Sequence, residues 1–298
     1  PVTFDPRIRP INLRRDLALA FVLPEAAVRV VHAEGAGCYG HNGADDVAFD
    51  AAWLAREVQG TPVRVLWSRA DELSHAPFGP AMAVALQAGF DDQGRVQQWQ
   101  HEVWSPGHSR RPGRSATPAL LGAWEMEPGF APPASIDMPL ASGGGAERNA
   151  IPGYDFPAVR VQLHSVKTAR RSSALRALGA FANVFAAESF LDEIAHHRGR
   201  CPLALRREHL AHDARALAVL DAAATAAGWA GRQKQDGTGH GIGSARYKNT
   251  GAWCAVVAEV HTAATLQVKQ LWIAVDVGQP VNPDGVAQQI EGGAIQAT

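Results

Sequence analysis

Apolar and polar residues alternate along this chain with two different periods, and the first of these predicts helices. Between residues 44 and 58, Val47, Ala51 and Leu54 recur at a spacing that places them on one helical face. Asp45 and Asp46 fall in the first turn, where acidic side chains interact favourably with the helix dipole. The same reasoning predicts helices over 13–23, 44–58, 173–195, 203–210 and 214–227, and one that starts at 284.

A period of two predicts strands elsewhere. The alternation from Met82 to Phe90 and the apolar run from Val96 to Trp104 are separated by Asp91-Asp92-Gln93-Gly94, which predicts an antiparallel hairpin. Further strands are predicted over 28–32, 61–68, 159–163, 241–247, 252–260 and 266–275. Strands of this kind mixed with long helices indicate an α+β fold class.

Residues 106–157 differ from the rest of the chain in composition and in hydrophobic pattern. Roughly a third of them are proline or glycine, and no hydrophobic period survives. We expect a long irregular excursion here. A structureless stretch of this length within a folded chain is usually functional or packed against a partner.

Composition narrows the class of protein. The 298 residues carry 28 basic and 29 acidic side chains, and this neutral balance argues against a protein whose main function is to bind nucleic acid. No apolar run is long enough to cross a bilayer. Three widely spaced cysteines fit neither a disulfide framework nor a zinc site. The chain starts at Pro1 without methionine and stops inside the helix predicted from 284, which predicts a fragment, a subunit of a split protein or a trimmed sequence.

A glycine-rich loop is the first candidate site. Residues 34–43 read E-G-A-G-C-Y-G-H-N-G and connect a predicted strand to a predicted helix. Glycines allow backbone N–H groups to approach a ligand closely, and a helix N-terminus favours anions. The spacing matches neither G-x-G-x-x-G nor a P-loop. From the spacing alone, the loop can equally be a tight turn without a ligand or a loop that binds a cofactor.

Arg176 is the second candidate, because it falls one turn into the apolar helix predicted over 173–195. It can be a surface arginine, a buried ion-pair partner, or a fixed guanidinium aimed at negative charge on a substrate. The arginines at 110, 111, 114, 170 and 171 are only modestly concentrated and predict ordinary surface rather than a nucleic-acid groove. His196 and His197 point to different faces of their helix and predict solvated surface rather than a metal site. No Ser-His-Asp order, carboxylate pair or H-E-x-x-H stands out.

Five ordered blocks resemble the molybdopterin-binding large subunit of the xanthine dehydrogenase (molybdenum hydroxylase) family, nearest the branch of nicotinate dehydrogenase and isoquinoline 1-oxidoreductase. They read E-G-A-G-C-Y-G-H-N-G-A-D-D-V-A at 34–48, R-V-L-W-S-R-A-D-E at 64–72, S-A-L-R-A-L-G-A-F-A-N-V-F-A-A-E-S-F-L-D-E-I-A at 173–195, A-R-Y-K-N-T-G-A at 245–252, and V-N-P-D-G-V-A-Q-Q-I-E-G-G-A-I-Q at 281–296. The resemblance covers nearly the whole chain except the proline- and glycine-rich excursion.

The resemblance implies two mixed α/β molybdopterin-binding domains, incomplete at both ends. We expect the first over 1–200, including the excursion at 106–157, and the start of the second over 201–298. It implies molybdenum held by a molybdopterin, in bacteria commonly the cytosine dinucleotide, and no protein residue as metal ligand. The implied partners are an iron–sulfur small subunit or domain and a cytochrome or flavin electron acceptor. A cytoplasmic location and the periplasmic side of a bacterial inner membrane both stay open.

Residue by residue, the resemblance assigns cofactor binding to Gly35, Ala36, Gly37, Cys38, Tyr39, Gly40 and Gln296. It assigns contact with the substrate and stabilisation of the transition state to Arg176. Two features of the family are missing. The stretch Arg7-Ile8-Arg9-Pro10 lacks the glutamine expected there, and the glutamate of a G-E-x-x-x-G motif, which is the family's catalytic base, does not occur in this chain.

The resemblance therefore implies part of an oxidoreductase that hydroxylates an electron-poor carbon of an N-heterocycle, nicotinate- or isoquinoline-like, with oxygen from water. Two alternatives remain: an aldehyde-oxidising relative with the same cofactor, and a non-catalytic scaffold. Without the glutamate, we expect the isolated chain to be inactive.

Overall fold

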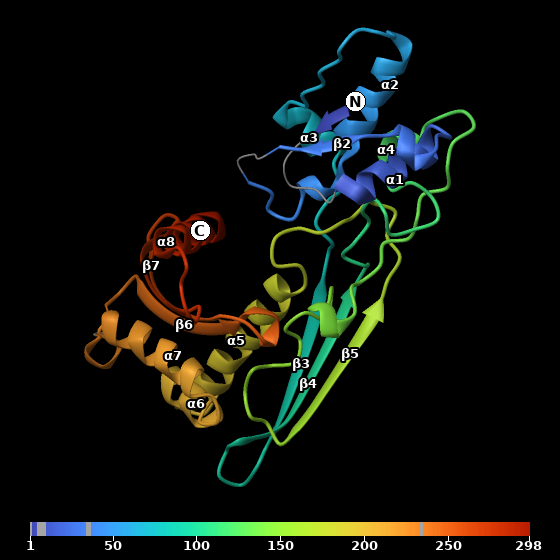
Figure 1. The fold of residues 1–298 in the computed structure, drawn as a ribbon. Helices are drawn as coiled ribbons and strands as arrows, with labels where there is room; N and C mark the ends of the chain where they lie inside the picture. The colour runs from blue at the N-terminus through green and yellow to red at the C-terminus, as the bar shows by residue number, and fades with distance from the viewer. Residues whose placement is uncertain (1, 5–9, 34–36, 233–234) are drawn as a thin grey trace. The chain divides into compact units, whose positions relative to one another are not determined.

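A computed structural model describes residues 2–4, 10–33, 37–232 and 235–298 (Figure 1). The chain divides into two compact units whose segments alternate in sequence. Unit 1 comprises residues 1–83, 103–148 and 163–181, and unit 2 comprises 84–102, 149–162 and 182–298. The division into domains at 200/201 stays a prediction.

Unit 1 is built mainly from short elements. Strands β1 (Val2–Phe4) and β2 (Val30–His32) pair in parallel. The helices are α1 (Pro10–Ala20), α2 (Asp46–Glu57), α3 (Arg69–His75) and α4 (Leu121–Trp124). Side chains from α1, α2 and α4 form its core, with Leu13, Leu17, Phe49 and Leu120 almost completely buried.

A further three-stranded sheet has the order β3-β4-β5. Its strands are β3 (Ala83–Phe90), β4 (Val96–Ser105) and β5 (Ala158–Ser165). The turn between β3 and β4 is closed by Asp91, whose carboxylate accepts hydrogen bonds from the backbone N–H groups of Gln93 and Arg95. Gly94 adopts the left-handed φ of +77° that such a turn requires. The hairpin prediction is confirmed.

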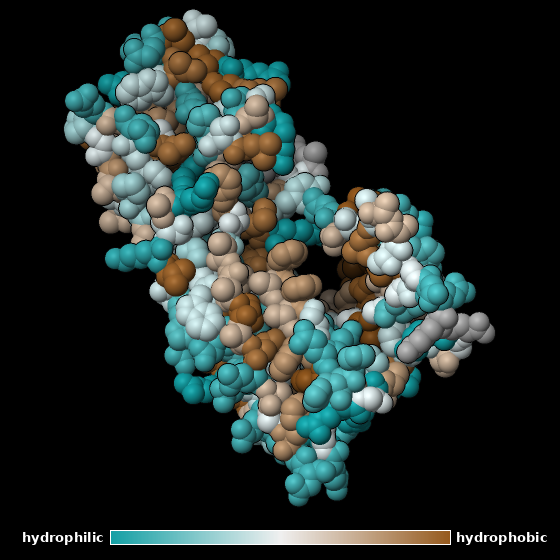
Figure 2. Space-filling model, turned by 180° about the vertical axis from the view of Figure 1, so that it is seen from behind, coloured by the Kyte–Doolittle hydropathy of each residue, from teal (hydrophilic) through white to brown (hydrophobic). Residues whose placement is uncertain are grey.

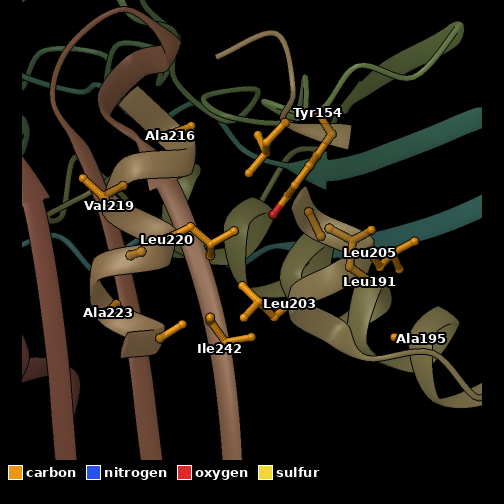
Figure 3. Packing of buried hydrophobic residues seen from close by; sticks show 14 of the residues in the cluster. Tyr154, Leu191, Ala195, Leu203, Leu205, Ala216, Val219, Leu220, Ala223 and Ile242 are labelled. Carbon is orange, nitrogen blue, oxygen red and sulfur yellow. The ribbon is translucent and has the colours of Figure 1, made fainter. Parts of the chain in front are cut away.

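Unit 2 contains an antiparallel meander with helices beside it. Strands β6 (Thr238–Arg246), β7 (Trp253–Thr262) and β8 (Leu266–Asp276) pair in sequence order. Helices α5 (Ala180–His197), α6 (Pro202–His209) and α7 (Ala214–Ala226) lie on one side of this sheet, and α8 (Pro283–Ala297) lies on the other (Figure 1). Leu191, Leu220 and Ile242 meet in the core between the helices and the sheet (Figure 3).

The predicted α+β class is confirmed, and so is the irregular character of 106–157, where only α4 and a turn of 3-10 helix at Leu140–Ser142 interrupt the loop. The strand predicted over 61–68 is wrong. This segment has the alternating pattern of a strand, but the structure shows no ladder for it among the described residues. A strand needs a hydrogen-bonded neighbour, which side-chain alternation alone does not supply.

Large hydrophobic side chains remain at the surface of each unit, interspersed with polar ones (Figure 2). Val22 and Leu66 in unit 1 and Val281 and Ile295 in unit 2 are each more than three-quarters exposed. Among the described residues, no helix has the length and apolarity that crossing a membrane requires. The three cysteines are free thiols, as the sequence predicts.

Candidate functional site

The glycine-rich loop connects β2 to α2 in unit 1, between the elements that the sequence predicts. Gly35 and Ala36 lie outside the described residues, and the description resumes at Gly37. From there the chain turns sharply, because the N–H of His41 donates to the carbonyl oxygen of Cys38 at 3.0 Å. Tyr39 and Gly40 both have positive φ, and the Tyr39 side chain is about half exposed. Cofactor binding by this loop, which the family resemblance implies, stays a prediction.

Gly40 brings the loop against the segment that carries Arg176. A Cβ atom on Gly40 would lie 2.8 Å from the carbonyl carbon of Leu175 and 2.9 Å from the backbone nitrogen of Arg176. Real Cβ atoms do not approach backbone this closely, so only glycine fits. The structure thus joins two candidate segments that lie far apart in sequence.

The sequence-based prediction for the surroundings of Arg176 is wrong. The helix α5 begins at Ala180, so residues 173–179 precede the helix instead of forming its first turns. Ala177 and Leu178 have φ values of +74° and +54°, which no right-handed helix accommodates. Arg176 lies in this turn and is exposed, so it is not the buried ion-pair partner that was one of the three alternatives.

Close packing of Gly179 explains why the helix starts late. Its N–H donates to the carbonyl oxygen of Gly145 at 3.0 Å, and a Cβ would lie 2.2 Å from the carbonyl oxygen of Ala146. Gly145 is equally tight, since a Cβ there would lie 2.0 Å from a carboxylate oxygen of Asp137. The sequence analysis missed this contact, although the triplet Gly143-Gly144-Gly145 inside the excursion was a usable signal.

Two neighbouring arginines of the excursion support the same segments. The guanidinium of Arg111 donates to the carbonyl oxygen of Gly40 and lies against Gly43. The hydroxyl of Ser173 accepts from the N–H of Arg110 at 3.2 Å and donates to its carbonyl oxygen at 2.9 Å. The guanidinium carbon of Arg110 lies 5.7 Å from the ring centre of Trp124, and both arginines are half-buried, so the prediction of ordinary surface is wrong for both.

Arg171 also differs from its prediction, because it forms a buried ion pair with Asp46. Both guanidinium NH₂ groups reach the carboxylate, at 2.8 Å and 2.7 Å. The two side chains are 11% and 2% exposed. Burial raises the pKa of the Asp46 carboxyl above its ordinary value, although the adjacent Arg171 charge opposes this shift. Burial, and next the positive charge of Arg171, lower the pKa of Arg110.

Gln296, the remaining predicted cofactor contact, belongs to unit 2 and lies in α8. Unit 2 has a polar cluster of its own beside a cavity of about 630 Å³. There the Glu188 carboxylate accepts from the Tyr154 hydroxyl at 2.7 Å, from Arg206 at 2.8 Å and from the N–H of Ser244 at 3.0 Å. Sequence analysis did not single out this cluster.

The described residues contain no group of three or more histidine, cysteine or acidic side chains arranged to hold a metal ion. Unit 1 instead offers glycine backbone and guanidinium groups. Both are N–H donors, and they suit a ligand that is bound through phosphate or other anionic oxygen atoms.

Comparisons with known proteins identify the family to which both parts of the chain belong. Residues 6–121 and 172–298 each match a family described as a molybdopterin cofactor-binding domain. The chain is 34% identical over 306 residues to a subunit of nicotinate dehydrogenase from Pseudomonas putida, covering 97% of this chain and 24% of that protein. It is 31% identical over 255 residues to the beta subunit of isoquinoline 1-oxidoreductase from Brevundimonas diminuta, covering 83% of this chain and 30% of that protein.

The fold is shared with a solved structure. Quinoline 2-oxidoreductase from Pseudomonas putida 86 superimposes with a TM-score of 0.56 at 18% identity, over 84% of this chain and 31% of that one. The chain thus spans less than a third of the length of each of these proteins. Sequence blocks, family matches and fold lead to one assignment: the chain carries two molybdopterin cofactor-binding domains of the molybdenum hydroxylase family.

Proposed function

We propose that this chain is the molybdenum-cofactor-binding portion of an oxidoreductase that hydroxylates an electron-poor carbon of an N-heterocycle, with oxygen from water. The relatives named for nicotinate and isoquinoline support this class of substrate. The observation that carries the proposal is the contact of Gly40 with the backbone of Leu175 and Arg176, because it unites the two segments that the family resemblance assigns to cofactor and substrate.

In this proposal the loop Gly35, Ala36, Gly37, Cys38, Tyr39 and Gly40 holds the cofactor, together with Gln296. When bound, the molybdenum cofactor supplies the two-electron redox chemistry and activates water. The glycines of the loop contribute backbone N–H donors without side-chain bulk, and the guanidinium of Arg111 donates to the carbonyl oxygen of Gly40. A cytosine dinucleotide form of the cofactor follows from the bacterial branch that the chain resembles.

Arg176 has the proposed role of stabilising negative charge that develops on the substrate as oxygen adds to carbon. A guanidinium presents a planar set of charged N–H donors that can stabilise an oxyanion. Its exposure and its place beside Gly40 support this role. The turn at 175–178 presents the side chain before the helix begins, so the arginine is not committed to the helix surface.

The proposed partners are an iron–sulfur subunit or domain and a cytochrome or flavin acceptor that receive the electrons. Relatives named as subunits of larger enzymes support the need for partner subunits. The proposal concerns the protein expressed from the natural gene, since the catalytic glutamate of the family is not among these 298 residues.

The test is turnover of nicotinate and isoquinoline by that protein in H₂¹⁸O with an artificial electron acceptor. We expect one ¹⁸O atom in a hydroxylated heterocycle, and molybdenum in the purified protein. Arg176→Lys should lower turnover at least tenfold with little loss of thermal stability, because lysine keeps the charge but loses the planar fork.

Arg170→Lys, the same change at another exposed arginine of unit 1, is the control and should leave turnover unchanged. Turnover of aldehydes alone would assign the protein to the aldehyde-oxidising alternative. Absence of both molybdenum and turnover would support a non-catalytic scaffold and refute the proposal.

A further inference from the structure

Asp46 connects three separate segments of unit 1 through one carboxylate. Besides the two bonds from Arg171, one of its oxygen atoms accepts the backbone N–H of Leu121 at 2.8 Å. Asp46 is the first residue of α2, and only its N-cap, Asp45, separates it from the loop at 37–44 that contains Gly40. The position of this carboxylate therefore fixes where the loop ends.

Arg171 makes a comparable set of contacts on its side. It donates to the carbonyl oxygen of His75, the last residue of α3, at 3.1 Å. Its guanidinium carbon lies 4.9 Å from the ring centre of Trp124 in α4. The pair Asp46–Arg171 thus meets α2, α3 and α4 at one buried point.

Backbone hydrogen bonds to Phe78 fix the chain on both sides of Ser172, directly after Arg171. The N–H of Phe78 donates to the carbonyl oxygen of Arg171 at 2.9 Å, and the N–H of Ser173 donates to that of Phe78 at 3.0 Å. Two residues beyond Ser173, the chain reaches the Leu175–Arg176 backbone that packs on Gly40. The ion pair and the Gly40 contact therefore connect the same two segments, 40–46 and 171–176, at two separate points.

A contribution to stability alone is a weak explanation for this pair. Removing two charged groups from water costs about as much as their attraction returns, so well-packed apolar residues often replace such a pair without loss. A bidentate guanidinium–carboxylate pair does supply one thing that apolar contacts lack, which is a defined direction and distance.

We infer that Asp46 and Arg171 are positioning residues for the cofactor site: their pair sets the register between the loop at 37–44 and the segment 172–179, and thereby the location of Arg176. This inference rests on the proposed function, because it gives the pair a role at the cofactor-binding segments. Neither residue is proposed to touch cofactor or substrate.

The variant that separates geometry from charge is Arg171→Lys. Lysine keeps the positive charge beside Asp46 but cannot donate to both carboxylate oxygens in a fixed plane while also reaching the His75 carbonyl. Arg170→Lys is the matched control, because this neighbouring arginine lies over the Phe78 ring at the surface. Asp46→Asn, which removes the carboxylate charge, is the second test variant.

Hydrogen exchange measured by mass spectrometry on the protein expressed from its natural gene gives the first readout. For Arg171→Lys we expect roughly tenfold faster exchange in peptides covering 37–46 and 172–179, with α1 changing less than about twofold. Asp46→Asn should show the same local pattern, and Arg170→Lys should match the unaltered protein. The second readout is the molybdenum content per chain. It should fall at least twofold in Arg171→Lys and stay unchanged in Arg170→Lys.

Three results would overturn the inference: unchanged exchange in both segments, a uniform increase that includes α1, or altered exchange with full molybdenum content. If Asp46→Asn does not fold, Arg171→Lys still decides among these outcomes. An unaltered protein without molybdenum would refute the proposed function, whereas the exchange pattern would still report whether the pair sets the register of the two segments.

Discussion

Replacing Gly40 by alanine should loosen the contact that joins the two candidate segments. The change adds a methyl group at a φ of +79°, where an L-residue is strained by about 1–2 kcal/mol. It also places that methyl group 2.8 Å from the carbonyl carbon of Leu175, and this distance must lengthen to about 3.4 Å for an ordinary contact. Because backbone rather than a flexible side chain must move, we add about 1–3 kcal/mol for overpacking.

Gly60→Ala isolates the first of these two contributions, the backbone strain. Gly60 has a φ of +83°, but nothing lies within 4 Å of the position of its Cβ. It therefore shares the backbone strain and lacks the clash, so its cost should be about 1–2 kcal/mol. The difference between the two variants, roughly 1–3 kcal/mol, measures the close approach of the loop to the Leu175–Arg176 backbone.

The assay is urea-dependent unfolding of unit 1, monitored through hydrogen exchange in peptides from α1 and α2. A probe specific to unit 1 is needed because two compact units need not unfold together. Molybdenum content should fall in Gly40→Ala and remain in Gly60→Ala. Equal losses of stability in the two variants would refute the reasoning, since they would mean that Gly40 is required only for its backbone conformation.

Three further predictions concern unit 2. Arg206→Met should destabilise this unit by about 3–5 kcal/mol in urea unfolding, because it leaves Glu188 without the fully buried guanidinium that pairs with it; a loss under about 1 kcal/mol would contradict this. Burial lowers the pKa of His101, whose Nδ1 has no partner among the described residues. As the pH falls below about 6.5, this histidine is therefore protonated in the unfolded chain before it is protonated in the folded one. The resulting stability is fully present above that pH and declines below it, by at most about 1.4 kcal/mol per pH unit, and His101→Gln should flatten this part of the unfolding profile. Hydrogen bonding from Arg215 lowers the pKa of Asp276 to about 2, and NMR titration should show this pKa returning toward its ordinary value in Arg215→Gln but not in Arg207→Gln.

The elements of the fold were predictable wherever local signals and tertiary packing agree. The hairpin at Asp91–Gly94 is an example, since its turn residues and the flanking alternation indicate the same structure. The helix predicted from 173 shows the opposite case. Its first seven residues have a helical apolar pattern, but Gly179 is held against the backbone at 145–146, and this non-local contact keeps the chain out of the helix until Ala180.

Arg170 and Arg171 show most directly why the site itself could not be derived from spacing. The two residues are chemically identical and adjacent, and the sequence offers the same surface interpretation for both. In the structure, Arg170 is exposed over a phenylalanine ring, whereas Arg171 is enclosed with a carboxylate 125 positions away. What distinguishes them is the direction of each side chain once Phe78 has paired with the backbone around Ser172, and that direction is set by a contact between distant segments. A pattern within one segment identifies which residues are capable of binding, but the pairing between segments determines which of them is used.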